Sequence, residues 1–315
     1  MLSVRPWKLG ALLRLGGGVF LCMVLGLVVL EALTYANEPR TAKASSFLLA
    51  IALSAGFLAS SFVLTRRTWT EENFFPGLAL VLACAFGGLV TAGWAQHLLG
   101  DATPDEKAAS TMIVPVLSLH GAGLVLIAAF LREHRVGWAE AFGFRQRRLR
   151  AIGWGIIGWL AGLAGISLLQ RFSVDVMDRF HFEAKEQMPV EVVRNAHSWL
   201  TIVVLGVLTV VLVPAVEEML FRGILYPAIK GRGYPRLALW GSAVAFGVVH
   251  GNLMGFLPLT FFAVLLVLVY ELTGNLLAPI LAHGLFNAGG FLALMLAHRS
   301  DLGPFFKRLQ HWLGG

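Results

Sequence analysis

Charged side chains are scarce in this sequence: Asp, Glu, Lys and Arg make up only 14% of the 315 residues, whereas 57% are hydrophobic. Soluble domains carry about a quarter charged residues, so the composition excludes an ordinary soluble protein and predicts a membrane protein. The net charge of +7 falls mainly between apolar runs, which is typical of cytoplasmic loops rather than of a surface that binds nucleic acid. We therefore expect no nucleic-acid partner.

The sequence also has few cysteines and lacks three common hydrolase signatures. The two cysteines, Cys22 and Cys84, lie inside apolar runs, which favours a packing role over a disulfide or a ligand pair. The sequence has no His-Glu-x-x-His motif of zinc proteases, no Gly-x-Ser-x-Gly motif of serine hydrolases and no Gly-x-Gly-Asp motif. It also shows no internal repeat, which disfavours a carrier built from inverted repeats.

Long apolar runs are present instead. Runs of about 20 residues, the length needed to cross a bilayer, occur near residues 11–34, 46–64, 77–99, 111–131, 151–170, 200–229, 236–256, 257–273 and 276–297. The sequence therefore predicts an all-α fold, a polytopic integral membrane helical bundle with about eight or nine transmembrane helices. More Lys and Arg fall in the inner loops when the N-terminus is cytoplasmic, so the positive-inside rule predicts that orientation.

These runs divide the chain into four segments. Residues 1–150 form an N-terminal transmembrane region of unknown role, and residues 151–199 combine a transmembrane helix with a polar extramembrane loop. Residues 200–297 hold the polar motifs described next. Residues 298–315 form a tail with aromatic and basic side chains, which is typical of an interfacial segment.

Two adjacent glutamates follow an uncharged stretch, residues 200–216. An ionisable group at the bilayer centre costs about 2.5–3.5 kcal/mol, so such groups usually pair and usually serve a function. The i,i+4 spacing of Glu218 and Arg222 predicts an ion pair with a structural role. Glu217 projects about 100° away from its neighbour, which leaves it to face another partner. Pro214 predicts a kink that frees a carbonyl one turn earlier.

Two further polar pairs interrupt the later spans. Phe246 is followed four residues later by His250, and His283 by Asn287. On a helix this spacing puts both members of a pair on one face. At 1.5 Å per residue, Glu217 and His250 lie about 18 Å and 21–24 Å from the loop that joins their spans, whereas His283 lies about 10 Å into its own. His283 joins the other two only if its helix starts deeper or tilts.

These side chains fit the chemistry of amide hydrolysis. A carboxylate beside an imidazole can take a proton from water, and a second histidine with a nearby asparagine can donate hydrogen bonds to an oxyanion. Four such groups in neighbouring spans are costly unless they form a site. The candidate catalytic residues are Glu217, His250, His283 and Asn287, with Glu218, Arg222 and Phe246 as structural support.

In this order, the three motifs resemble those of the CPBP family of intramembrane proteases, which includes the type II CAAX prenyl endopeptidases and the bacterial Abi-type proteins. The string from Glu217 to Gly223 and the stretch from Thr273 to Asn287 resemble the bacterial branch. The resemblance covers residues 200–297. It implies a protease of the bacterial inner (plasma) membrane, whose partners are the lipid bilayer and a membrane-anchored or lipidated protein or peptide substrate.

The resemblance also implies roles for the site residues. Glu217 acts with His250 to activate water, whereas His283 and Asn287 stabilise the oxyanion. Family members have been described both as metalloproteases and as metal-free glutamate proteases. Because the sequence lacks a His-x3-His chelate, we favour a site without a metal. Zinc is the alternative, and its three ligands are then Glu217, His250 and His283.

Two other functions stay open at this stage. A proton-coupled membrane transporter could use Glu217 and the histidines as a proton relay. A non-hydrolytic protein-sorting relative of the same family would pass the cleaved chain to another acceptor. An assay for cleaved against transferred product separates the sorting activity from hydrolysis.

Overall fold

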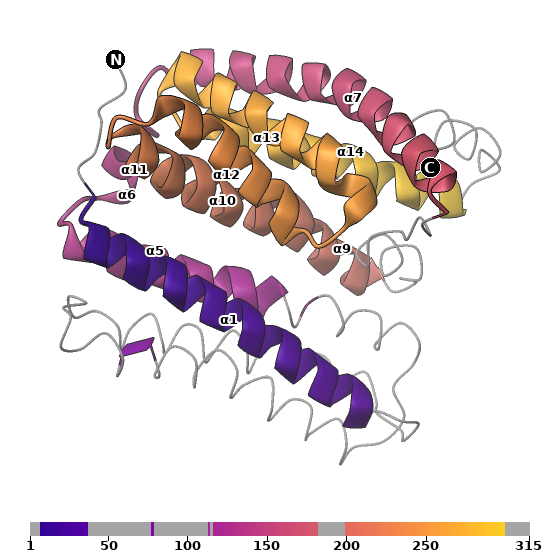
Figure 1. The fold of residues 1–315 in the computed structure, drawn as a ribbon, viewed down its shortest axis with the longest axis horizontal. Helices are drawn as coiled ribbons and strands as arrows, with labels where there is room; N and C mark the ends of the chain where they lie inside the picture. Colours follow the sequence, from indigo (N-terminus) through magenta and orange to yellow (C-terminus); the bar gives the residue numbers. More distant parts are fainter. Residues whose placement is uncertain (1–6, 37–76, 79–112, 114–115, 182–198, 300–315) are drawn as a thin grey trace. The chain divides into compact units, whose positions relative to one another are not determined.

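The computed structural model describes residues 7–36, 77–78, 113, 116–181 and 199–299, drawn as coloured ribbons in Figure 1. This part of the chain contains helices and no β-strand, as the all-α prediction requires. Its helices that are long and apolar enough to cross a membrane are Arg148–Arg179, Trp199–Lys230, Leu253–Thr273 and Leu277–Leu296. These helices support an integral membrane protein. The count of eight or nine spans stays a prediction, because the run 46–64 and nearly all of 77–99 lie outside the described residues.

The chain divides into two compact units, and each is described by itself. The motif unit comprises Met1–Pro6, Trp138–Arg194 and Thr209–Gly315, and the N-terminal unit comprises Trp7–Gly137 and Asn195–Leu208. All seven candidate site residues belong to the motif unit.

The N-terminal unit contains α1 (Leu9–Ala36), η1 (Leu117–Gly121), α5 (Ala122–Glu133) and α9 (Trp199–Val207). Helix α1 packs against α5. An ion pair joins the two helices, with Nη2 of Arg14 2.6 Å from Oε1 of Glu133. The ring of Trp7 packs edge-on against that of Phe130, with their centroids 5.0 Å apart. The described parts of the runs 11–34 and 111–131 are therefore helical, as predicted.

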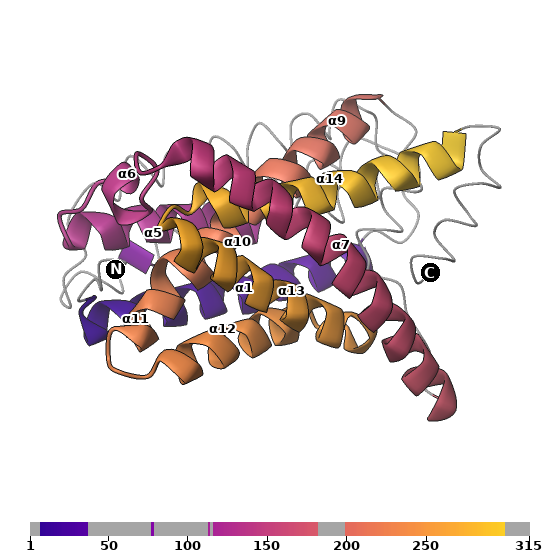
Figure 2. The same ribbon diagram turned by 90° about the horizontal axis from the view of Figure 1, so that it is seen from above.

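The motif unit contains α6 (Trp138–Ala141), α7 (Arg148–Arg179), η2 (Leu208–Leu212, from Thr209), α10 (Val213–Glu218), η3 (Met219–Leu225), α11 (Tyr226–Lys230), α12 (Pro235–Val249), α13 (Leu253–Thr273) and α14 (Leu277–Arg299). Helix α7 packs against α13 and α14, α12 against α13, and α10 against α14. Figures 1 and 2 show α7 running across α13 and α14. Helix α14 packs against α10, and α12 and α13 pack against η3, so three helices contact the stretch that carries the glutamate pair.

One continuous helical stretch, Trp199–Lys230, carries the glutamate pair. It matches the predicted run 200–229. Two π-helical segments interrupt its α-helical geometry, η2 just before α10 and η3 just after it. The π-helix is rare and occurs mostly as single turns within α-helices, frequently at functional sites. The sequence patterns did not predict either segment.

The boundary between α12 and α13 differs from the prediction. The apolar runs were divided between residues 256 and 257, whereas α12 ends at Val249 and α13 begins at Leu253. In the turn, Gly251 has a φ of +60°, which glycine adopts at little cost. Asn252 caps α13, because its side-chain oxygen accepts a hydrogen bond from the N–H of Gly255 at 2.7 Å. These two residues end one helix and start the next inside an otherwise apolar stretch.

Helix α7 is longer than the predicted run 151–170. It extends from Arg148 to Arg179, so the polar segment 171–199 begins as a continuation of this helix. Residues 182–198 and the predicted interfacial tail from residue 300 onward lie outside the described residues.

Glycines on one face of α7 allow it to approach its neighbours closely. A Cβ atom at Gly155 would lie 2.9 Å from the carbonyl oxygen of Ala278, and a Cβ atom at Gly158 would lie 2.8 Å from Cγ1 of Val269. Both separations are shorter than real Cβ atoms tolerate. Small residues at such positions let membrane helices pack at short range. The contact of α7 with α13 and α14 therefore depends on these glycines.

We predict that Gly158→Leu lowers stability by about 1–3 kcal/mol, the usual cost of forcing extra atoms into a packed interface. Gly153 supplies the matched control, because it lies on the same helix with no atom within 4 Å of its Cβ position. Thermal unfolding of the purified variants in detergent is the measurement. Equal midpoints for Gly158→Leu and Gly153→Leu would contradict the proposed packing.

Candidate active site

The ion pair expected between Glu218 and Arg222 is present at the junction of α10 and η3. Nη1 of Arg222 donates a hydrogen bond to Oε1 of Glu218 at 2.9 Å, and both residues are fully buried. Nη2 of Arg222 donates to the carbonyl of Ala263 at 3.1 Å, and the guanidinium lies 4.5 Å from the ring centroid of Phe246. A buried ion pair needs such additional partners to offset its desolvation. The pair therefore ties its own helix to α12 and α13.

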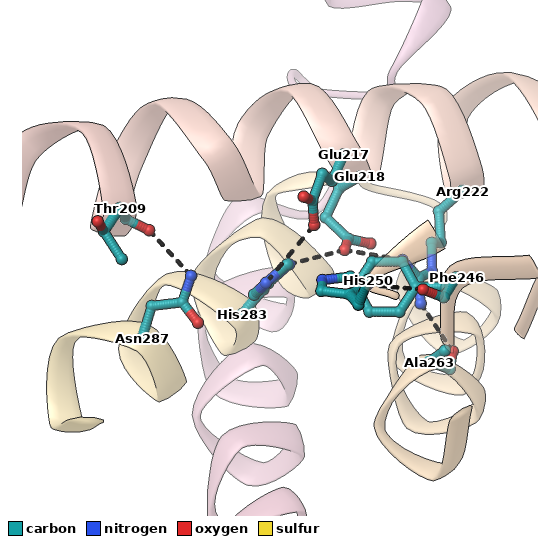
Figure 3. A network of polar contacts seen from close by, with 9 residues as sticks. All are labelled: Thr209, Glu217, Glu218, Arg222, Phe246, His250, Ala263, His283 and Asn287. Atoms are coloured by element: carbon teal, nitrogen blue, oxygen red, sulfur yellow. Dashed lines mark hydrogen bonds and ion pairs between the residues drawn. The ribbon is translucent and has the colours of Figure 1, made fainter. Parts of the chain in front are cut away.

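His283 lies beside both glutamates (Figure 3). Its Nδ1 is 3.0 Å from Oε1 of Glu218, and its Nε2 is 3.9 Å from Oε2 of Glu217. A carboxylate that is paired with Arg222 can only accept, so we assign a proton to Nδ1 of His283 and direct its Nε2 toward Glu217. The sequence interpretation separated the two acids by about 100° and gave Glu218 only Arg222 as partner. The structure shows instead that one imidazole contacts both.

His283 reaches the glutamates because α14 begins inside the motif unit. Asn275, Leu276 and Ala278, around the start of α14, are fully buried. The N–H of Leu276 donates to the carbonyl of Phe142 at 2.9 Å, which holds this start against α6 and the turn after it. Helix α14 begins at Leu277, within one residue of the predicted run, so the depth of His283 in the bilayer stays a prediction, whereas its contacts bring it to the two glutamates.

The ring of Phe246 joins the two histidines. Its centroid lies 4.7 Å from that of His250 and 5.8 Å from that of His283, and Phe246 is fully buried. At the end of α12, Nδ1 of His250 is 2.7 Å from the carbonyl oxygen of Phe246. A carbonyl only accepts, so Nδ1 of His250 carries a proton, and Nε2 of the neutral ring holds a lone pair. His250 therefore offers a basic nitrogen next to the cluster.

Asn287 contacts backbone on the side of the site away from Arg222 (Figure 3). Its Nδ2 donates to the carbonyl of Thr209 at 2.9 Å. A carboxamide has two N–H donors, so one further donor is left for another acceptor. The oxyanion role that the resemblance implies for Asn287 stays a prediction.

Exposure differs sharply among the charged members of the cluster. The side chain of Glu217 is 17% exposed, that of His283 is 6% exposed and that of Glu218 is fully buried. Glu217 is therefore the more accessible of the two adjacent acids. A carboxylate that is accessible and lies beside an imidazole has the geometry of a general base.

Zinc, the alternative to a metal-free site, would need three ligand side chains close together. Within the described ranges, no three His, Cys, Asp or Glu side chains form a group that could hold a metal ion. Glu217 and His283 present two donor atoms 3.9 Å apart, but His250 does not complete a three-ligand group with them. The described residues as arranged therefore do not fit the three-ligand zinc site set out above.

Some contributors to the site were missed by the sequence interpretation. Ala263 and Thr209 each supply a backbone carbonyl, the first to Arg222 and the second to Asn287. Nothing in the sequence marks Ala263. In a regular α-helix Pro214 would free the carbonyl of Val210, so the role of Thr209 depends on the π-helical segment that the sequence patterns did not predict.

Residues 198–289 match the family model described as "Type II CAAX prenyl endopeptidase Rce1-like". This match confirms the resemblance expected from the three motifs, and it includes all seven candidate residues. The curated "Uncharacterized protein YpbD" of Bacillus subtilis (strain 168) is 36% identical over 81 residues. That alignment covers 24% of this chain, and the chain spans only 39% of that relative's length. No solved structure matches.

We predict that Glu218→Gln and Arg222→Met each lower folded yield and cost about 3–5 kcal/mol of stability, because each leaves one charge buried without its counter-charge. Glu271→Gln is the matched control. Glu271 pairs with Lys230 at 2.6 Å, but both side chains are 30% exposed, so its loss should cost at most about 1 kcal/mol. Yield from membranes and thermal unfolding in detergent provide the comparison. Wild-type yield for both buried-pair variants would remove the structural role assigned to the pair.

Proposed function

We propose that this chain, whose residues 198–289 match the Rce1-like family of type II CAAX prenyl endopeptidases, is an intramembrane endopeptidase. It hydrolyses a peptide bond of a membrane-associated protein or peptide. The observation that carries the proposal is the contact of His283 with Glu217 and Glu218, made between two helices long and apolar enough to cross a membrane. Ionisable groups within membrane-spanning segments usually mark a functional site.

Glu217 is the general base in this proposal. Its side chain is 17% exposed, whereas that of Glu218 is fully buried, so Glu217 is the acid of the pair that we assign to the reaction. It takes one proton from water while the water oxygen bonds to the carbonyl carbon of the scissile peptide. The lone pair on Nε2 of His250 assists by accepting a hydrogen bond from the same water. Glu217 then delivers the proton to the departing amine, which completes hydrolysis.

His283 is the proposed donor to the oxyanion. Nδ1 of His283 is held by Glu218, and its Nε2 lies on the side of Glu217. In this proposal the ring carries a proton on each nitrogen during the reaction, so Nε2 can donate a hydrogen bond. A preorganised donor in a site with little water stabilises a developing oxyanion strongly. The free N–H of Asn287 is the second donor that the resemblance implies.

Glu218 acts on the reaction through His283 and not on the substrate. Its Oε1 fixes Nδ1 of His283 at 3.0 Å and is itself fixed by Arg222 at 2.9 Å. A carboxylate that orients an imidazole sets both its ring angle and its protonation pattern. The two adjacent acids thus have separate roles, one in orientation and one in proton transfer.

We expect Glu217→Gln to abolish turnover while the fold stays intact, because the amide keeps the shape of the side chain but cannot accept the proton. Membranes from cells that express either form are compared by mass spectrometry for new peptide C-termini. In water enriched in oxygen-18, hydrolysis incorporates the label into the new carboxylate, whereas transfer to another acceptor does not. Glu140→Gln, on α6, is the control substitution. Wild-type cleavage by the Glu217→Gln variant would overturn the proposal.

Metal dependence separates two versions of this mechanism. Without a catalytic metal, purified active protein should contain substoichiometric zinc, and a chelator should leave turnover unchanged. With zinc, changes at Glu217, His250 and His283 should each lower the bound metal, and activity lost to a chelator should return when zinc is added. Elemental analysis beside activity decides between them. Stoichiometric zinc lost in step with activity would overturn the metal-free version and leave the site residues in place.

A further inference from the structure

Pro214 leaves a backbone carbonyl without its donor just before the glutamate pair. In a π-helix, each N–H bonds to the carbonyl five residues earlier. Segment η2 is π-helical through Leu212, so the donor in π-helical register with Thr209 is residue 214. Proline has no N–H. A carbonyl left unpaired within an apolar span is costly, so another group has to supply a donor.

Helix α14 supplies that donor and packs closely beside it. Nδ2 of Asn287 donates to the carbonyl of Thr209 at 2.9 Å. At Gly284, a Cβ atom would lie 2.8 Å from the carbonyl oxygen of Val210, which is closer than real Cβ atoms come. Val210 is the residue in α-helical register with Pro214. An N–H at residue 214 could have bonded to the carbonyl of Thr209 in π-helical register or to that of Val210 in α-helical register. Both carbonyls lie against α14, the first at Asn287 and the second at Gly284.

We propose that Thr209, Pro214, Gly284 and Asn287 form a helix lock that sets the position of α14 against the glutamate helix. The residue before Gly284 is His283, whose two ring nitrogens contact Glu218 and Glu217. The lock therefore positions His283 between the two acids, and its effect on catalysis rests on the function proposed above. In this assignment Asn287 acts as a positioning residue through the N–H that it donates to Thr209. This role is independent of its second N–H.

The helix lock and a pure oxyanion role predict different results for a second substitution. Only under the lock should a substitution that restores a backbone N–H near Thr209 offset the loss of Asn287. Asn287→Ala removes the donor to Thr209, and Pro214→Ala returns a backbone N–H to the same helix. We expect Asn287→Ala to lower the Tm by about 2–6 °C, the effect of one unsatisfied buried carbonyl. It should also lower turnover by about 10- to 100-fold through misplacement of His283. The double variant Pro214→Ala/Asn287→Ala should recover most of the Tm and at least part of the turnover.

The experiment uses full-length protein in detergent for Tm and folded yield, and in liposomes for turnover of a fluorogenic farnesylated peptide ending in a CAAX sequence. Leu292→Ala, an exposed change on the same helix, should be additive with Pro214→Ala. Gly284→Ala tests the lock without removing a hydrogen bond, and Gly289, with open space at its Cβ position, is its control. Gly284→Ala should lower Tm and turnover, whereas Gly289→Ala should leave both near wild type.

Each outcome bears on the lock. Recovery of Tm, or of folded yield if Asn287→Ala fails to fold, supports it. Strictly additive effects of Pro214→Ala and Asn287→Ala on Tm, or equal behaviour of Gly284→Ala and Gly289→Ala, would overturn it. Recovery of Tm with no recovery of turnover supports the lock and leaves Asn287 as an additional donor to the substrate. If the wild-type protein does not cleave this peptide, the peptide is excluded as a substrate, whereas the Tm results still judge the lock.

Discussion

The burial of Glu218 and Arg222 as a pair is the constraint on which the rest of the site depends. Neither charge meets water, so the free energy of the pair depends on what surrounds it. Arg222 takes its second acceptor from Ala263 on α13 and a ring face from Phe246 on α12, while Glu218 accepts from His283 on α14. One ion pair thus fixes the glutamate helix against three others. The catalytic proposal uses the geometry that this burial already requires.

The two π-helical segments explain how one helix can serve so many partners. A π-helical turn holds more residues than an α-helical turn, so it shifts the faces that follow it and loosens the backbone ladder. Segment η2 together with Pro214 exposes carbonyls toward α14, and η3 begins at the residue after Glu218 and carries Arg222. Between them, α10 keeps regular geometry across Glu217 and Glu218. The π-helical turns therefore lie where the helix contacts its neighbours, and the α-helical turn between them carries the two glutamates.

Much of this arrangement could be predicted from the sequence, because charges within apolar runs have few possible partners. The i,i+4 spacing predicted the ion pair, and hydropathy predicted the helix 200–229. The boundary at Gly251 and Asn252 was missed because a hydropathy pattern does not reveal a turn that consists of one glycine and one helix-capping residue. The contact of His283 with Glu218 was missed because residue spacing identifies partners only within one helix. The buried start of α14, at Asn275 and Leu276, depends on tertiary packing that no local pattern records.

Two neighbouring glutamates can have different chemistry because their surroundings differ more than their positions do. Glu218 is fully buried and shares Oε1 between a guanidinium and an imidazole, so its surroundings hold it in one position. Glu217 is partly exposed and lies 3.9 Å from the other nitrogen of the same imidazole. A proton taken up by Glu217 therefore changes the interaction with His283 at Nε2 while the bond at Nδ1 persists. In the proposed mechanism, His283 thus keeps its orientation while charge moves from Glu217 to the oxyanion, which is the property that a preorganised site needs.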